Sequence, residues 1–199
     1  MRTHAVVVVL ALTLLAGSSV LAASAFSTAT VKRSANLNVV TDGSGLIELT
    51  PGATKAVQYD ASGELSIDIS KTGGSGVNPN AEYTFGDGSQ ITAASKPSDL
   101  ASTDYAFALK LNDDLNGSAS GLKLDYAAAT NSEPNVKFVV YEVGGSKVTT
   151  ASEESSGTIS NPGTKTYGVV LVVDTGAGSA STPLGKGTDL SGTLTITTA

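Results

Sequence analysis

Apolar residues recur at every second position over most of the chain, and this alternation is typical of β-strands with one buried face. The run of residues 166–174 (TYGVVLVVD) is apolar in both phases, which predicts a central strand covered on both faces. The alternation predicts strands at residues 31–39, 45–49, 55–59, 65–69, 105–111, 122–126, 136–141, 166–174 and 190–197.

The segments between these runs are rich in turn-forming residues. Sequences such as TDGSG, KTGGSG, GDGS and SNPG place Gly, Asn and Asp where a turn requires positive φ. Helical turns are expected only around residues 94–102. About nine or ten short strands with turns between them predict an all-β fold, an antiparallel two-sheet sandwich that is jelly-roll-like.

The first 25 residues are typical of a secretory signal peptide. A short basic start precedes an apolar run at residues 6–17, which is shorter than the about 20 residues that span a membrane. Small residues at the end of the segment predict cleavage between Ala25 and Phe26. Cleavage before the apolar run, as in class III pilins, is a second interpretation. We therefore expect a secreted single domain, residues 26–199, with no membrane association after cleavage.

After residue 25 the chain has no His, Cys, Met or Trp, and this limits the chemistry that it can perform. A Ser-His-Asp triad and zinc or copper sites built on His and Cys need side chains that are missing. Eleven basic residues stand against 18 acidic ones, a net charge of −7, which disfavours nucleic acid as a partner. We expect no enzyme and no cofactor, although a carboxylate pair of the glycosidase type stays open.

The loop sequence NDDLNG, residues 112–117, partly matches a calcium-binding loop. An EF-hand is rejected because Lys123 stands where a bidentate Glu belongs. A looser calcium site at Asp113 and Asp114 remains open beside the simpler interpretation, a polar hairpin turn. Asn116 begins the N-glycosylation sequon NGS, and a glycan would compete with calcium for the same loop.

The segment that follows the predicted cleavage site has one apolar phase. The residues at these alternate positions are Val31, Arg33, Ala35, Leu37 and Val39. Arg33 is the one charged residue among them and the only arginine after residue 25. The 15 residues from 26 to 40 can extend over about 50 Å. Because an open sheet edge can accept a strand from another chain, the segment can pair in two ways. It either forms the first strand of its own domain or acts as a donor strand for a neighbouring copy.

Several blocks of the sequence resemble a family of secreted archaeal proteins with a SipW-type signal peptide, catalogued as a domain of unknown function. The blocks are residues 25–52, residues 76–92 (GVNPNAEYTFGDGSQIT), the run 166–174 and the closing SGTLTITTA. The sequence departs from the family at ITA, residues 91–93, where the family reads ITN. More distantly, the cleavage region ASAFST resembles the TasA and camelysin group and the archaeal bundling pilins.

The resemblance implies a structural role. TasA-like proteins and bundling pilins form extracellular fibres in which each subunit donates an N-terminal strand to the next. We therefore expect a non-catalytic structural protein of the archaeal cell surface or biofilm matrix, self-associating into pilus-like filaments. The alternative is a soluble surface module that binds glycan or calcium.

Overall fold

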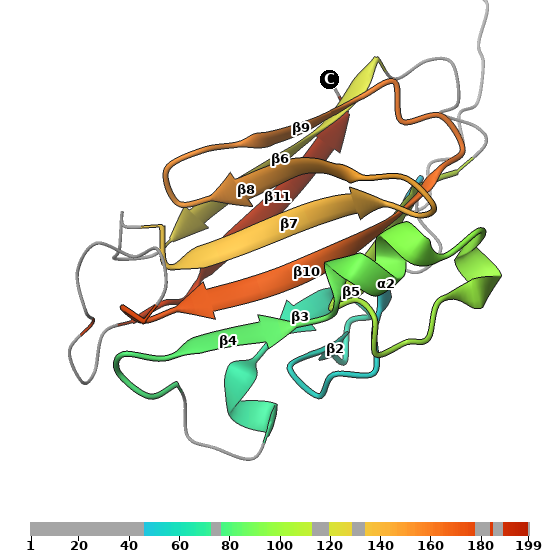
Figure 1. Cartoon of the computed structure of the whole chain (residues 1–199). Helices are drawn as coiled ribbons and strands as arrows, with labels where there is room; N and C mark the ends of the chain where they lie inside the picture. Colours follow the sequence, from blue (N-terminus) through green and yellow to red (C-terminus); the bar gives the residue numbers. More distant parts are fainter. Residues whose placement is uncertain are drawn as a thin grey trace, which may run out of the picture. The chain divides into compact units, whose positions relative to one another are not determined.

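The computed structural model describes residues 46–72, 77–112, 120–128, 134–177, 184 and 189–198, which belong to one compact unit spanning residues 39–199. These residues contain eleven strands, the α-helix α2 (Gly88–Ala93) and the 3-10 helices η2 (Ile69–Thr72) and η3 (Pro97–Asp99) (Figure 1). The strands are β1 Ile47–Pro51, β2 Val57–Tyr59, β3 Leu65–Ile67, β4 Glu82–Phe85, β5 Phe107–Leu111, β6 Gly121–Ala128, β7 Val136–Glu142, β8 Lys147–Ser152, β9 Gly157–Ser160, β10 Thr166–Asp174 and β11 Gly192–Thr198.

The largest sheet has six strands, all antiparallel to their neighbours, in the order β1-β5-β10-β7-β8. Strand β10 lies at its centre, and two strands share one of its edges. Strand β5 pairs with the first half of β10 and β4 with the second half. The other edge of β10 pairs with β7 over seven residues. Every residue of β10 except its first and its seventh is buried, as expected for a strand between two partners with both faces covered.

A second sheet, of order β11-β6-β9, faces the first across the core, and β2 and β3 form a separate hairpin. The alternation places one phase of each strand inside. Many of the least exposed inward side chains come from β5, β6, β7 and β10. They are Phe107, Leu109, Leu111, Leu122, Leu124, Phe138, Val140, Val169, Leu171 and Val173, none more than 1% exposed. The predicted antiparallel sandwich is therefore confirmed, and Phe107 and Phe138 lie in its core.

Strands β8 and β9 close one side of the sandwich, because β8 belongs to the large sheet and β9, next in sequence, to the small one (Figure 1). The backbone N–H of Ser152 donates to the carbonyl of Ser155 (2.8 Å) in the turn between them. In the same turn the carboxylate of Glu153 accepts the N–H of Val136 with both oxygens (2.9 and 3.1 Å). Burial raises the pKa of Glu153 above its usual value. The turn thus also holds the beginning of β7.

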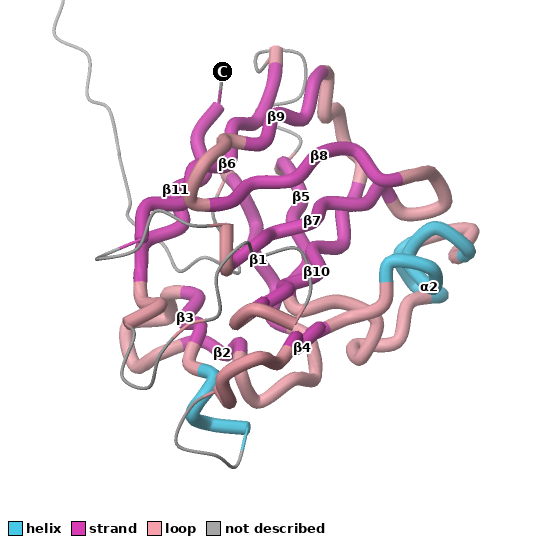
Figure 2. The backbone as a smooth tube through the Cα atoms, turned by 60° about the vertical axis from the view of Figure 1, so that its left-hand side comes forward, coloured by secondary structure: helices cyan, strands magenta, loops and turns pink. Residues whose placement is uncertain are grey.

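Helix α2 packs on the outer face of the large sheet. Asp87 caps its first turn, where Oδ1 accepts the backbone N–H and the hydroxyl of Ser89 (2.9 and 2.6 Å), and these bonds lower the pKa of Asp87. Ile91 is fully buried against Gly168 of β10. Figure 2 shows α2 and β11 on opposite sides of β7 and β10. The prediction that GDGS is only a turn was wrong, because Asp87 initiates a helix.

The other strands and helical turns predicted within the described residues are present, with shifted ends. The strand at residues 166–174 matches β10 at both ends, and η3 lies within the predicted helical turns at residues 94–102. The strand predicted at residues 45–49 begins two residues later in the described part, and that at 65–69 ends early in η2. Strands β4, β8 and β9 were not predicted. The predicted strand at residues 31–39 lies outside the described residues.

Candidate functional site

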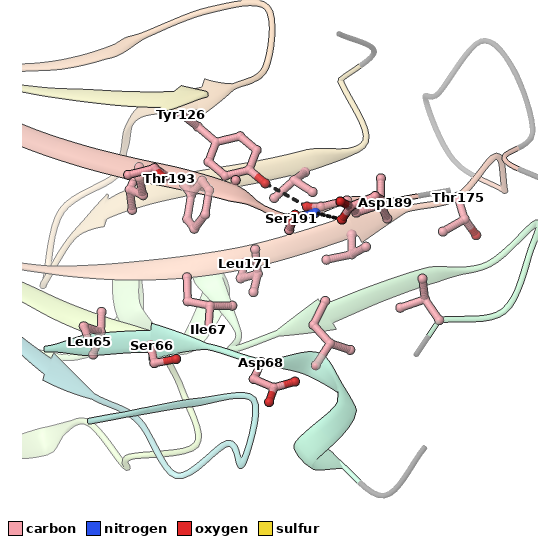
Figure 3. A pocket seen from close by; sticks show the side chains of 18 of the residues that line it. Leu65, Ser66, Ile67, Asp68, Tyr126, Leu171, Thr175, Asp189, Ser191 and Thr193 are labelled. Atoms are coloured by element: carbon pink, nitrogen blue, oxygen red, sulfur yellow. Dashed lines mark hydrogen bonds between the residues drawn. The ribbon is translucent and has the colours of Figure 1, made fainter. Parts of the chain in front are cut away.

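An open groove lies between the two sheets, on the side opposite the closing strands β8 and β9. Its volume is about 940 Å³, and its described walls come from β3, β7 and β10 on one side and from β6 and β11 on the other. Figure 3 shows Ile67 of β3 extending toward Leu171 of β10, with Thr193 of β11 across the gap. The groove therefore opens directly onto the hydrophobic core. Its apolar lining residues are Leu49, Leu65, Ile67, Ile69, Val77, Val136, Phe138, Leu171, Val173, Leu184, Leu190, Leu194 and Ile196.

Two of the strands that border the groove, β3 and β11, are edge strands within the described part of the chain. There β11 pairs only with β6, and β3 pairs only with β2. Half of the N–H and C=O groups of an edge strand point away from its sheet and are free to pair with an added strand. The apolar side chains along both strands, Leu194 and Ile196 on β11 and Leu65 and Ile67 on β3, are only half-buried. The groove therefore offers both backbone pairing and uncovered apolar surface.

Tyr126 anchors the beginning of β11 at the wall of the groove. Its hydroxyl donates to the carbonyl of Leu190 (2.9 Å), and its ring packs at a tilt of 57° against Phe138, with the ring centres 5.3 Å apart. The tyrosine is 7% exposed. Burial, with the nearby charges of Glu153 and Asp189, raises the pKa of Tyr126 to about 12. This contact holds the approach to β11 against β6 and keeps that wall in place.

The rim of the groove is acidic. Four carboxylates line it, and none of the described lining residues is basic; the four are Asp60, Glu64, Asp68 and Asp189. Asp60 is also structural, because its Oδ1 accepts the N–H groups of Ser62 and Glu64 in the turn between β2 and β3. At Asp189, hydrogen bonds from Ser191 lower the pKa and favour the carboxylate. The rim is thus suited to a ligand with an apolar body and a cationic group.

A buried polar cluster fixes the end of β10 next to the groove. The side-chain amide of Asn135 donates to the carbonyl of Asp174 (2.6 Å), whose own N–H donates to the carbonyl of Asn135 (2.8 Å). The hydroxyl of Thr175 accepts the N–H of Ala81 (2.8 Å) and lies 2.6 Å from the carbonyl of Asn78. Each of these hydrogen bonds involves the backbone, which is typical of a structural rather than a reactive site.

The sites predicted from the sequence lie outside the described residues. They are the cleavage site Ala25 and Phe26, the donor-strand residues Val31, Arg33, Ala35, Leu37 and Val39, the calcium candidates Asp113 and Asp114, and the sequon residue Asn116. These assignments stay predictions. The groove itself was not predicted. The alternating polar residues of β11 and the acids beside β3 were visible in the sequence, but no pattern showed that these strands border one opening.

Comparison with known proteins does not extend these observations: no protein-family model, no curated protein and no solved structure matches the chain. The resemblance to secreted archaeal proteins therefore stays a prediction. Within the described ranges, no group of three or more His, Cys, Asp or Glu residues could hold a metal ion. The helices described there are all too short or too polar to cross a bilayer.

Proposed function

We propose that the chain is an exported structural protein of the cell surface or extracellular matrix whose copies assemble by strand addition. In this assembly, residues 31–40 of one copy enter the groove of the next. The observation that carries the proposal is the groove, which lies over the core between two edge strands that each have one partner among the described residues. An edge strand beside uncovered apolar surface is the usual acceptor for β-augmentation.

The segment fits the groove in length and pattern. Ten extended residues span about 33 Å and the seven residues of β11 about 23 Å, so the segment can follow the whole strand. Its apolar phase would face the core, and its polar phase, Lys32, Ser34, Asn36 and Asn38, would face solvent. Each Val or Leu that becomes buried contributes about 1.5–3 kcal/mol. Several such side chains, with new backbone hydrogen bonds to β11, would stabilise an intersubunit contact.

Because the natural chain has no Cys, engineered cysteines report this contact without background. Two single variants of the exported chain, Asn36→Cys and Thr195→Cys, are mixed and oxidised. Thr195 is exposed on β11, and the Cβ atoms of directly paired strand residues lie close enough for a disulfide. We expect a heterodimer on non-reducing gels and fibres of the natural chain by electron microscopy.

A matched control uses Val148→Cys, which is exposed on β8 at the closed side of the sandwich. It should not cross-link to Asn36→Cys. If Asn36→Cys forms no heterodimer with Thr195→Cys while a double variant forms the bond within one chain, the segment completes its own domain, and assembly by strand exchange is refuted.

The second candidate function, a glycan or calcium module, has less support. Of the described aromatic rings only Tyr59 is strongly exposed, and its hydroxyl donates to the carbonyl of Leu49 (2.5 Å). A flat carbohydrate platform needs more than one exposed ring. The calcium candidates Asp113 and Asp114 lie outside the described residues. Calorimetric titration with Ca²⁺ and with soluble oligosaccharides tests this candidate, and saturable binding would favour it.

A further inference from the structure

The large sheet ends at β1, and an exposed strand edge of this kind can accept a strand from a second copy. Within the described part of the chain, β1 pairs only with β5. Other described edges are shorter or covered. Strand β4 has four residues, and β8 and β9 lie edge to edge, where the N–H of Thr158 donates to Oγ1 of Thr149 (3.2 Å). Strand β1 is therefore the edge that competes with β11 for an added strand.

The hydrogen bonds to β5 show which backbone groups of β1 face the open edge. The N–H of Asn112 donates to the carbonyl of Leu46 (2.9 Å), and the N–H of Gly52 donates to the carbonyl of Ala106 (2.8 Å). Hydrogen-bonded pairs recur at every second residue of an antiparallel ladder, so the even-numbered residues of β1 bond with β5. The N–H and C=O groups that point away from the sheet therefore belong to Ile47, Leu49 and Pro51.

Two side chains take part of this edge out of backbone pairing. The hydroxyl of Tyr59, from β2, donates to the carbonyl of Leu49 (2.5 Å), the middle one of the three outward residues. Pro51 has no N–H, so the last outward residue offers no donor. Tyr59 is 40% exposed, so burial of its ring contributes little to holding it there. The hydrogen bond to the edge carbonyl is the contact that fixes its hydroxyl.

We infer that Tyr59 and Pro51 close the β1 edge to a second copy; that this leaves β11 as the acceptor rests on the strand addition proposed above. Without the two side chains, β1 is self-complementary. Two copies of the strand can pair antiparallel about Leu49, which places Glu48 of one copy opposite Thr50 of the other and keeps the like charges apart. Such a twofold contact would join copies through the wrong edge.

Cysteine cross-linking measures whether the β1 edge is closed. Chains with Glu48→Cys and chains with Thr50→Cys are mixed and oxidised, first with the natural edge and then with Tyr59→Ser and Pro51→Thr added to both. Directly opposite residues of paired strands are close enough for a disulfide. We expect about tenfold more heterodimer from the opened edge, because one carbonyl is released and one N–H donor is added.

A milder variant and a matched control accompany this comparison. Tyr59→Phe removes only the hydroxyl, so the fold should be kept and the heterodimer should increase about threefold, as expected for one released hydrogen bond. Tyr83→Phe removes a hydroxyl that accepts the N–H of Asn78 (3.0 Å) and does not touch β1, so the amount of heterodimer should not change. Melting curves establish that each variant remains folded.

The outcomes separate the closed edge from the strand addition. Equal amounts of heterodimer from the natural edge, the opened edge and Tyr59→Phe, whether high or low, refute the closure of β1. Asn36→Cys should form no heterodimer with Thr50→Cys in chains with the natural edge, and a heterodimer there refutes β11 as the preferred acceptor. If Asn36→Cys also fails to cross-link to Thr195→Cys while β1 responds to its opening, the proposed function is refuted and the closure of β1 stands.

Discussion

Gly168 of β10 lies directly beneath helix α2, and replacing it by Ala should destabilise the protein measurably. A Cβ at this position would lie 2.6 Å from Cδ1 of Ile91 and 3.0 and 3.1 Å from Cγ1 and Cγ2, whereas ordinary contacts are 3.4–4 Å. Ile91 is fully buried, so it has no open space into which to turn. Either the side chain leaves its rotamer or the helix moves outward by about 1 Å.

Two opposing contributions determine how much the free energy of unfolding should decrease in Gly168→Ala. Overpacking of a core position costs about 1–3 kcal/mol, and Ala in place of Gly restricts the unfolded chain, which returns about 0.4–1 kcal/mol. The two ranges combine to a net decrease in the free energy of unfolding of about 0–2.6 kcal/mol, with a centre at about 1.3 kcal/mol. For a domain of this size the central value lowers the melting temperature by about 3–5 °C. Thermal and urea unfolding followed by circular dichroism measure both quantities.

A second substitution tests whether Ile91 is the cause. Ile91→Val removes Cδ1, the nearest atom, and alone should cost about 0.5–1.5 kcal/mol. Combined with Gly168→Ala it should cost little or restore stability, because the space it vacates receives the new methyl group. The double-mutant cycle should give a favourable coupling of about 1 kcal/mol. Additive effects of the two substitutions would show that α2 does not rest on Gly168 as described.

Three further predictions concern single side chains. Burial raises the pKa of Tyr126 and of Tyr167 to about 12, so the stability that these groups contribute is complete below pH 10 and is lost as the pH rises toward 12, by up to about 1.4 kcal/mol per pH unit and tyrosine. The absorbance of the phenolate, which no Trp obscures, should show two rings that titrate late, and titration of all rings near pH 10 would refute their burial. The hydroxyl of Thr150 is buried without a hydrogen-bond partner among the described residues, so Thr150→Val should stabilise the protein by about 1 kcal/mol in urea unfolding, and a loss would reveal a hidden partner. The raised pKa of Glu153 means that ionisation of its carboxyl group opposes folding. The free energy of unfolding of the natural protein should therefore fall relative to that of Glu153→Gln as the pH rises from 4 to 7, and a difference that stays constant over this range would contradict the raised pKa.

The strands that were predicted best from the sequence are those with a regular pattern of buried residues. Strand β10 is apolar in both phases because its inner face meets the core and its outer face meets α2, so both its position and its central place could be predicted. Strands β8 and β9 were missed because they carry few large apolar residues; β9 contributes only Ile159 to the core. These two strands connect one sheet to the other, and this connection does not require a long alternation of apolar and polar residues.

Helix α2 was missed although the sequence contains a signal for it. Asp87 is followed three residues later by Gln90, the spacing of a capping box, and the backbone N–H of Gln90 donates to the carbonyl of Asp87 (3.1 Å). The two glycines around Asp87 favoured a turn instead. Gly86 does adopt positive φ (100°), but Gly88 lies in the helix and makes room for the ring of Tyr141. The local sequence thus favoured both a helix and a turn, and the contact of Gly88 with Tyr141 favoured the helix.

The groove could not be predicted because its walls are distant in sequence. Strand β3 and the residues before β11 are more than a hundred positions apart, and their juxtaposition depends on the whole order of strands. The alternation did indicate which side chains of β11 face inward. It could not indicate that the described part of the chain provides this strand with only one neighbour.

The exposure of the core side chains supplies an independent reason to expect an added strand. On the side closed by β8 and β9, inward residues such as Val140, Ala151 and Ile159 are at most 1% exposed. At the groove, Leu194 and Ile196 have the same inward phase yet remain half-buried. Among these residues, the incomplete burial of inward apolar side chains is therefore confined to the groove side of the sandwich. A chain without disulfides depends on burial for its stability. We propose that the alternating residues 31–39 cover this apolar surface, whichever copy provides them.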